Sequence, residues 1–340
     1  MTRDDISCTY LLTVLLPRLV SWDATAIGAA DDSSRHQLEQ THQMISIGKI
    51  SLIATLVVVG ASMIEAWVLS RKGQPRFDWH EVMLSLIDLI GRKLLALLPL
   101  SLAAPVFAFA WDHRIYTATI NSALMVLLLF VGQEFCYYWY HRASHRIRFF
   151  WATHAVHHSP NQLTLSSAYR LGWTGKLTGA AIFFTPLVWL GVRPEIVLAT
   201  LMINLLYQFW LHNTWMPKLG WLEYVLNTPS AHRVHHASNA EYLDANYGGV
   251  LIIFDRLFGT YIEERKEVPC RYGLTTPTRS HNPFVVQFEH WMSLARDIAA
   301  SKRPWTAIEY VLRPPGWRPD GAGETTEELR RSVANKVANN

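Results

Sequence analysis

The sequence is poor in cysteine and in charge. Its 340 residues include only Cys8, Cys136 and Cys270, which lie far apart in the chain. An odd number of cysteines at this spacing predicts neither a disulfide framework nor a cysteine metal site. Charged residues make up 17% of the chain and leave a net charge of +4, so nucleic acid is not an expected partner. The basic residues stand mostly at the ends of apolar runs, where anionic lipid headgroups would attract them.

Apolar runs take the place of charge. Half of the residues are hydrophobic, which is high for a soluble protein. The run from Ile47 to Ser70 has Glu65 as its only acidic interruption and is long enough to cross a bilayer. Three further regions predict membrane segments: Val82–Trp111, kinked by Pro99 and Pro105, then Tyr116–Tyr140, and a hairpin of Leu177–Gly191 and Ile196–Leu211. We therefore expect four or five membrane segments in contact with the bilayer.

The two ends of the chain differ from this middle part. Cys8–Val20 is apolar, but Asp4 and Asp5 precede it, so a packed or interfacial helix is expected rather than a signal peptide. Phe284–Ala299 has apolar residues at helical spacing and predicts either a helix lying along the headgroups or an ordinary packed helix. Gly321–Asn340 is polar and predicts a poorly ordered tail. The expected parts are an N-terminal tail at 1–45, a membrane domain at 46–265 and a C-terminal region at 266–340.

Nine of the fifteen histidines are grouped at short spacing. They are His141 and His145, then His154, His157 and His158, then His212, and finally His232, His235 and His236. Residues three and four apart share a helix face, so each motif is expected to direct its imidazoles to one point. Neutral imidazole is a common ligand of iron and zinc. Neither helix stability nor core packing favours this spacing, so the pattern predicts a metal-dependent enzyme.

Charge predicts on which side of the membrane these histidines lie. Arg71, Lys72 and Arg76 follow the first apolar run, and the positive-inside rule places that end in the cytoplasm. The alternating segments then bring all nine histidines to the same side, beside hydrocarbon, which suits a lipid substrate. The expected architecture is an all-α integral membrane helical bundle with a cytoplasmic, histidine-rich helical cap, in a bacterial inner membrane or the endoplasmic reticulum.

Three motifs carry a resemblance to a known family. They are the stretches Glu134–His145, Trp151–Ser159 and Asn227–His236. This region, about residues 133–264, resembles the fatty acid hydroxylase superfamily, also called the sterol desaturase family, whose members are non-haem diiron membrane enzymes. Leu205–His212 and Tyr242–Thr260 are most similar to the corresponding stretches of alkylglycerol monooxygenase-like proteins.

The resemblance implies a cofactor and a reaction. The nine grouped histidines would hold two iron ions, and O2 would be a co-substrate. The enzyme would be an oxidoreductase of lipid metabolism that hydroxylates a lipid C–H site, or cleaves or desaturates the lipid. Arg146 stands where alkylglycerol monooxygenase-like proteins carry a glutamate linked to a tetrahydropterin reductant. The reductant is therefore open, and an electron-donor protein could bind a basic rim made of Arg142, Arg146, Arg148 and Arg233.

Two polar residues of the apolar segments are candidates for catalysis. Gln208 stands where some relatives carry a further histidine, four residues before His212. It would ligate metal, hold a metal-bound water, or satisfy the backbone of a neighbouring helix. Glu134 lies seven residues before His141 on the same helix face, where it would orient a ligand imidazole through the free N–H. Its alternative is an ion pair with Arg142 or Arg170.

Three residues after the last histidine motif have two interpretations each. Asn246 is a candidate catalytic residue, and Asp244 a weaker candidate, yet both precede a glycine pair where a turn is expected. Asp255 is expected to pair with Arg256 or another arginine.

Other functions use the same residues. Zinc has a similar affinity for imidazole but no redox chemistry. Within the superfamily, a sterol or fatty acyl desaturase or an aminolipid headgroup hydroxylase is the alternative enzyme. A membrane metal carrier or haem-anchoring protein is the alternative from another class, although carriers usually place ligands within the span and on opposing sides.

Overall fold

Helices form all the regular structure in the described part of the chain. A computed structural model describes residues 32–72, 77–98, 100–278 and 280–338, so the predicted Cys8–Val20 helix lies outside it. Extended pairing within these ranges is limited to two isolated bridges, Leu226–Leu251 and Ala237–Tyr272. The elements are α3 (Asp32–Arg71), α4 (Trp79–Ala96), α5 (Ala103–Asp112), α6 (Ala123–Arg146), α7 (Arg148–His158), η3 (Leu165–Tyr169), η4 (Trp173–Lys176), η5 (Ala180–Phe184), α8 (Thr185–Trp189), α9 (Pro194–Phe209), η6 (Gly220–Tyr224), α10 (Pro229–His235), α11 (Ile253–Leu257), α12 (Pro283–Ala300), α13 (Pro304–Leu312) and α14 (Thr326–Ala338).

Two described helices are long and apolar enough to cross a bilayer: α6 and the Lys49–Arg71 part of α3. The other predicted segments are broken into shorter pieces. Val82–Trp111 divides into α4 and α5, Leu177–Gly191 forms η5 and α8, and α9 has 16 residues. The all-helical fold is thus confirmed for these residues, whereas the expected number of four or five spans is not.

Helix α6 starts later and continues further than expected. The Ser122 hydroxyl accepts a hydrogen bond from the Met125 amide at 3.3 Å and caps the helix at its N-terminus. From there α6 continues through both His141 and His145 to Arg146. Its first turns are apolar, and Leu124, Leu127 and Leu128 are each more than half exposed. Such a surface is expected where a helix contacts lipid rather than water.

An apolar core joins α6 to the shorter apolar helices. Phe107 of α5, Leu129 of α6, Phe184 of η5, Val188 of α8 and Val197 of α9 are all buried in it. Pro194 at the first position of α9 fixes the backbone where the chain turns into this helix. The core therefore ties α9 to α6, and both helices run toward the histidine motifs.

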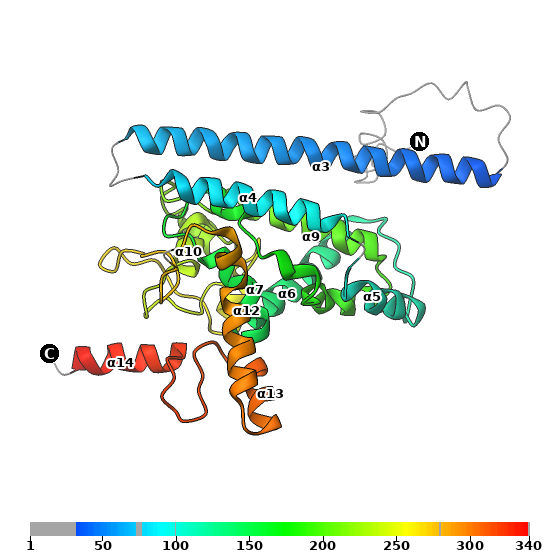
Figure 1. Cartoon of the computed structure of the whole chain (residues 1–340). Helices are drawn as coiled ribbons and strands as arrows, with labels where there is room; N and C mark the ends of the chain where they lie inside the picture. The colour runs from blue at the N-terminus through cyan, green and yellow to red at the C-terminus, as the bar shows by residue number, and fades with distance from the viewer. Residues whose placement is uncertain (1–31, 73–76, 99, 279, 339–340) are drawn as a thin grey trace.

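Helix α3 is fastened to the rest of the protein by polar groups. It lies beside α4 along one edge of the molecule (Figure 1), and Lys93 donates to the Ser51 hydroxyl between them. The Glu65 carboxylate accepts from the Leu165 amide at 2.6 Å and from the Trp215 indole at 2.9 Å. Because buried polar groups need partners, these bonds fix the position of α3 on the segments that follow α7 and α9.

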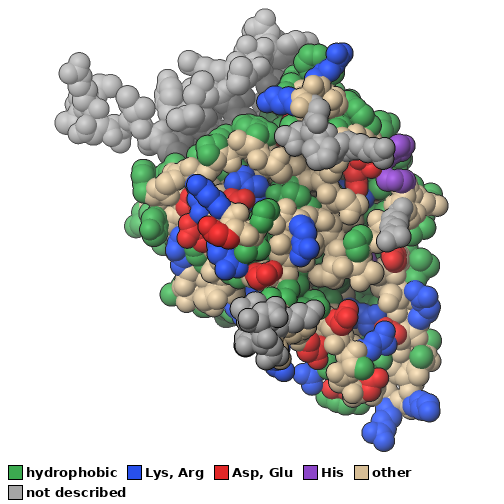
Figure 2. Space-filling model, turned by 90° about the vertical axis from the view of Figure 1, so that its left-hand side faces the viewer, with side chains coloured by type: hydrophobic (Ala, Val, Ile, Leu, Met, Phe, Trp, Pro, Cys, Tyr) green, Lys and Arg blue, Asp and Glu red, His purple; other side chains and the backbone are tan. Residues whose placement is uncertain are grey.

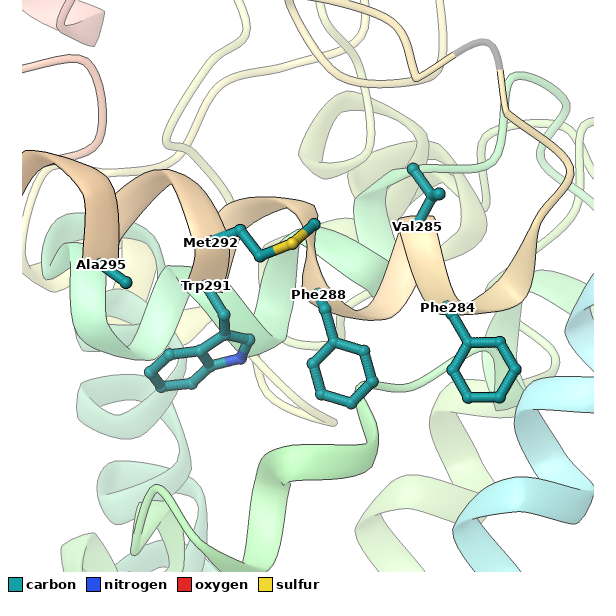
Figure 3. Close-up of a pocket in the computed structure, with 6 residues that line it drawn as sticks. All are labelled: Phe284, Val285, Phe288, Trp291, Met292 and Ala295. Carbon is teal, nitrogen blue, oxygen red and sulfur yellow. The ribbon is translucent and has the colours of Figure 1, made fainter.

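The C-terminal region is built of helices. Helix α12 packs against α7 and α13, with Val286, Gln287 and Leu294 buried while Phe284 stays 63% exposed. It borders an apolar hollow of about 630 Å³ (Figure 3), lined by Phe284, Val285, Phe288, Trp291, Met292 and Ala295. The expected poorly ordered tail is not found over Thr326–Ala338, which forms α14 instead.

Candidate metal centre

The nine grouped histidines meet in two sets of ring nitrogens. Within each set the nitrogens lie within 4.8 Å of one another. We call them the five-histidine group, which contains His141, His145, His154, His158 and His235, and the four-histidine group, which contains His157, His212, His232 and His236. Eight of the nine side chains are buried, and His154 is partly exposed.

Each His-x-x-His-His motif divides between the two groups. On α7, His154 and His158 are four residues apart and belong to the five-histidine group, whereas His157 points to the other group. On α10 the division is reversed, since His235 alone joins the five-histidine group. The expectation that each motif directs all its imidazoles to one point is therefore wrong. Successive helix positions differ by about 100°, so the histidines three and four residues after the first one of a motif face different groups.

Backbone carbonyls hold four of the imidazoles from behind. The Nδ1 atom of His141 lies 2.8 Å from the Tyr247 carbonyl, that of His212 lies 2.8 Å from the Gln208 carbonyl, and that of His235 lies 2.8 Å from the Ala245 carbonyl. His157 Nδ1 faces the Arg170 carbonyl at 3.2 Å. A carbonyl only accepts, so Nδ1 carries the proton and the Nε2 lone pair faces inward.

One contact tests directly whether these residues fit a metal. The Nε2 atoms of His157 and His212 lie 3.3 Å apart. Both imidazoles use their proton on a carbonyl, so two lone pairs face each other and no hydrogen bond can form between them. His235 Nε2 is likewise buried without a hydrogen-bond partner among the described atoms. A cation between such nitrogens removes this repulsion, so the residues fit a metal ion in each group.

Burial keeps the imidazoles neutral. It lowers the pKa of every ligand histidine outside α6: His154, His157, His158, His212, His232, His235 and His236. For His157 the pKa falls to about 4. Neutral imidazole is the metal-binding form, so the folded chain holds these side chains in the protonation state that a metal ion needs.

Asn246 stabilises α10, and its side-chain hydrogen bonds to described residues go to backbone groups rather than to the nine histidines. Its side-chain amide donates to the Ala231 carbonyl at 2.9 Å and to the Ile262 carbonyl at 2.8 Å, and its oxygen accepts from the Ile262 amide. Its φ of 56° is left-handed, a conformation that asparagine tolerates better than most residues. The candidate catalytic residue is thus a turn former that fixes the helix carrying His232 and His235.

Glu134 and Gln208 belong to one buried polar network between α6 and α9. Glu134 accepts from the Val250 and Leu251 amides at 2.7 and 2.9 Å, and also from Asn204. Gln208 donates to Asn204 at 2.5 Å and accepts from the Tyr137 hydroxyl at 3.0 Å.

Glu134 was expected to contact an imidazole, but its carboxylate binds the 250–251 backbone instead. It supports the loop whose Tyr247 carbonyl orients His141. Gln208 acts on a ligand through its own carbonyl, which holds His212, and its side chain is engaged by protein groups. Asn204, four residues before Gln208 on α9, is the polar residue at helical spacing that sequence reasoning missed.

Two acidic residues have contacts other than those expected from the sequence. Asp255 accepts from the Tyr247 and Gly248 amides and from the Thr260 hydroxyl, each at 2.7 Å. It fixes the turn at Tyr247 rather than pairing with Arg256. Asp244 lies 3.4 Å from His145 Nδ1 and is the carboxylate that faces a ligand imidazole.

The predicted basic rim is largely neutralised within the chain. Arg233 is buried and bonds Glu264 through two nitrogens, at 2.8 and 2.6 Å. Arg148 pairs with Asp297, and Arg146 pairs with Asp244. Figure 2 shows basic and acidic side chains interleaved over one face of the molecule. Arg233 is therefore unavailable for an acidic partner, and the prediction that it belongs to the basic rim is wrong.

Comparison with known proteins identifies a matching family and several relatives of this chain. Residues 126–260 match the model of the fatty acid hydroxylase family. Alkylglycerol monooxygenase of Homo sapiens is 36% identical over 258 residues, which cover 76% of this chain and 57% of the relative. That of Danio rerio is 34% identical over 271 residues, covering 79% and 58%. Ornithine lipid hydroxylase OlsE of Rhizobium tropici is 29% identical over 168 residues, covering 49% and 51%.

The chain thus spans a little more than half the length of the human and zebrafish relatives. No solved structure matches it.

Proposed function

Residues 126–260 form a domain of the fatty acid hydroxylase family, and on this basis we propose that the chain is a membrane-bound, O2-dependent lipid oxygenase with a pair of iron ions. The facing Nε2 lone pairs of His157 and His212 are the observation that carries the proposal. A cation between them would remove their repulsion, and the five imidazoles of the second group could hold another. Bound iron would supply the reduction of O2 with outside electrons and the attack on an unactivated lipid C–H bond.

The protein's part is to hold the ligands and keep the site dry. The carbonyls of Tyr247, Arg170, Gln208 and Ala245 fix four imidazole rings. The burial of eight ligands excludes water that would compete for the metals. Such fixed geometry costs no rearrangement when substrate arrives.

The membrane placement is part of the proposal. Helix α6 is apolar and exposed in its first turns and carries His141 and His145 in its last turns, while His212 follows the end of α9. Both apolar helices thus end at the metal centre, which supports a site at the membrane surface with the lipid chain among α6 and α9. The basic pair Arg71 and Lys72 at the end of α3 favours the cytoplasmic face.

The relatives favour two substrate classes. The name of the human relative points to the ether-linked carbon of an alkylglycerol lipid, which is our first candidate. The similarity to OlsE favours a hydroxylation of an aminolipid as the second. A tetrahydropterin, another small reductant or an electron-donor protein would supply the electrons, and Arg146 is the residue that distinguishes this chain from the alkylglycerol monooxygenase pattern.

Metal analysis tests the proposal first. The protein purified in detergent should hold two iron ions per chain, and His157→Ala should lose the ion of the four-histidine group. His80→Ala is the matched control, since His80 is exposed and lies outside both groups. A wild-type chain that does not bind two ions after reconstitution with ferrous iron under anaerobic conditions would overturn the proposal.

Product analysis under ¹⁸O2 tests the reaction. Membranes containing the wild-type chain are supplied with an alkylglycerol lipid, an ornithine-type lipid or a sterol, together with a tetrahydropterin or a ferredoxin system. Label in an aldehyde or alcohol product supports an oxygenase and identifies the substrate class. Desaturation without incorporated label would replace the proposed oxygenase by a desaturase, and metal transport without O2 consumption would replace it by a carrier.

A further inference from the structure

We propose that Asp244 is a positioning residue for the five-histidine group and that α14 holds it in place. The inference rests on the proposed pair of metal ions. Its starting point is a difference between the ligands: His141, His157, His212 and His235 are held from behind by backbone carbonyls. His145 faces a carboxylate instead, with its Nδ1 atom 3.4 Å from Asp244 Oδ1.

The Asp244 carboxylate is also bonded by other side chains, among them Thr326 of α14. Its other oxygen, Oδ2, accepts from Arg146 at 2.9 Å. The side chains of His145 and Asp244 are 5% and 13% exposed, so water screens the pair little. Asp244 has a left-handed backbone with φ of 53°, which turns its side chain back toward the end of α6. Aspartate is among the few residues that accept this conformation.

Helix α14 closes the same contact from outside. Glu327 of α14 bonds the second guanidinium nitrogen of Arg146. Arg330 donates to the Leu243 carbonyl, next to Asp244 in the chain. A continuous chain of contacts therefore runs from α14 through Arg146 and Asp244 to the ligand His145 (the C-terminal helix is red in Figure 1).

A carboxylate partner changes what the imidazole does. A hydrogen bond to a charged acceptor is stronger than one to a carbonyl. At 3.4 Å the Asp244 carboxylate attracts the Nδ1–H of His145, which favours the tautomer with the Nε2 lone pair inward and makes the imidazole a stronger metal ligand. His145 Nε2 is buried without a hydrogen-bond partner among the described atoms, as expected of a nitrogen reserved for metal. The five-histidine group should hence bind its ion more tightly than five imidazoles without a carboxylate partner would.

The test is the metal affinity of each group in Asp244→Asn, measured on the full chain in detergent. Outer partners of ligand histidines typically contribute 10–100-fold in metal affinity. We expect the ion of the five-histidine group to be lost at about 10–100-fold lower chelator concentration than in wild type, while the other ion stays. Mössbauer spectra of ⁵⁷Fe-loaded protein should show one of two iron signals changed and the other unchanged.

The control is Asp297→Asn, because Asp297 pairs with Arg148 in a similar half-buried contact away from both groups. It should keep both ions and both signals. Wild-type affinity and spectrum in Asp244→Asn would overturn the inference, and so would equal loss of both ions, which indicates a general loss of structure. If Asp244→Asn does not fold, Glu327→Gln answers the same question, since it should weaken the same signal alone. A wild-type chain without two ions refutes the proposed function instead.

Discussion

Acid should destabilise the metal-free protein, and His157 should account for one proton of this dependence. Burial lowers the pKa of His157 from 6.5 to about 4 in the folded chain. In the unfolded chain the imidazole is in water and returns to its ordinary pKa. Between pH 6.5 and about 4, the unfolded chain therefore binds a proton that the folded chain excludes.

The sign and size follow from this difference. The stability contributed by neutral His157 is fully present above pH 6.5, decreases as the pH falls, and is lost once the pH passes through the folded pKa. Each unit of pKa difference corresponds to about 1.36 kcal/mol. Over the whole window His157 should lower the free energy of unfolding by about 3 kcal/mol.

The assay compares wild type with His157→Gln, both stripped of metal by a chelator and kept in detergent. Unfolding by graded denaturant is followed by tryptophan fluorescence at pH 6.5 and at pH 4. Wild type should lose about 3 kcal/mol more than the variant between these two values, since the remaining histidines act equally in both. His80→Gln, which changes an exposed histidine, should follow wild type. An equal loss in wild type and His157→Gln would refute the reasoning.

Three further outcomes follow from the contacts. Glu134→Gln turns an amide group toward the Val250 and Leu251 N–H groups or toward Asn204, so the free energy of unfolding should fall by about 2–4 kcal/mol; a change below about 0.5 kcal/mol would contradict this. Asn246→Ala removes three hydrogen bonds and strains a left-handed position, so denaturation midpoints should show a loss of about 3 kcal/mol, with weakened metal binding; unchanged midpoints would speak against it. The chain should stay in the membrane pellet after an alkaline carbonate wash, because α3 and α6 are long and apolar; release into the supernatant would exclude spanning helices.

The residues of the candidate metal centre can be predicted from the sequence, whereas their division into two groups cannot. Spacing of three and four predicts histidines on neighbouring helix positions. The group to which the second histidine of a motif points, as at His157 and His235, depends on where the opposite helix lies. The motifs of α7 and α10 each contribute one histidine to the group that contains the other two histidines of the opposite motif. This pairing results from tertiary packing, which no local sequence pattern contains.

The residues that orient the ligands are harder to predict for a different reason. The carbonyls of Tyr247, Arg170 and Ala245 hold imidazoles, and a backbone carbonyl is present in every residue, so its role has no signal in the sequence. Asp244 and Asn246 were recognisable as turn formers, and both have positive φ. Only the folded turn shows that Asp244 faces His145 while Asn246 faces α10.

The membrane segments show the limit of hydropathy. The apolar run Ile47–Ser70 corresponds to the long α3, and Tyr116–Tyr140 overlaps α6. Val82–Trp111 is equally apolar in parts but is interrupted between α4 and α5. An apolar run therefore predicts that a segment has apolar surroundings. The length of the helix depends on where the segment is interrupted.

The way α3 is attached limits how this protein can be engineered. A generic membrane anchor could replace α3 only if it supplied an acid in place of Glu65 and a hydroxyl in place of Ser62, because these groups bind Leu165, Trp215 and Tyr169. The short segment that contains Leu165 and Tyr169 leads to Arg170, whose carbonyl supports His157. Chimeras that exchange the first helix for an unrelated tether should therefore be judged by iron content as well as by insertion.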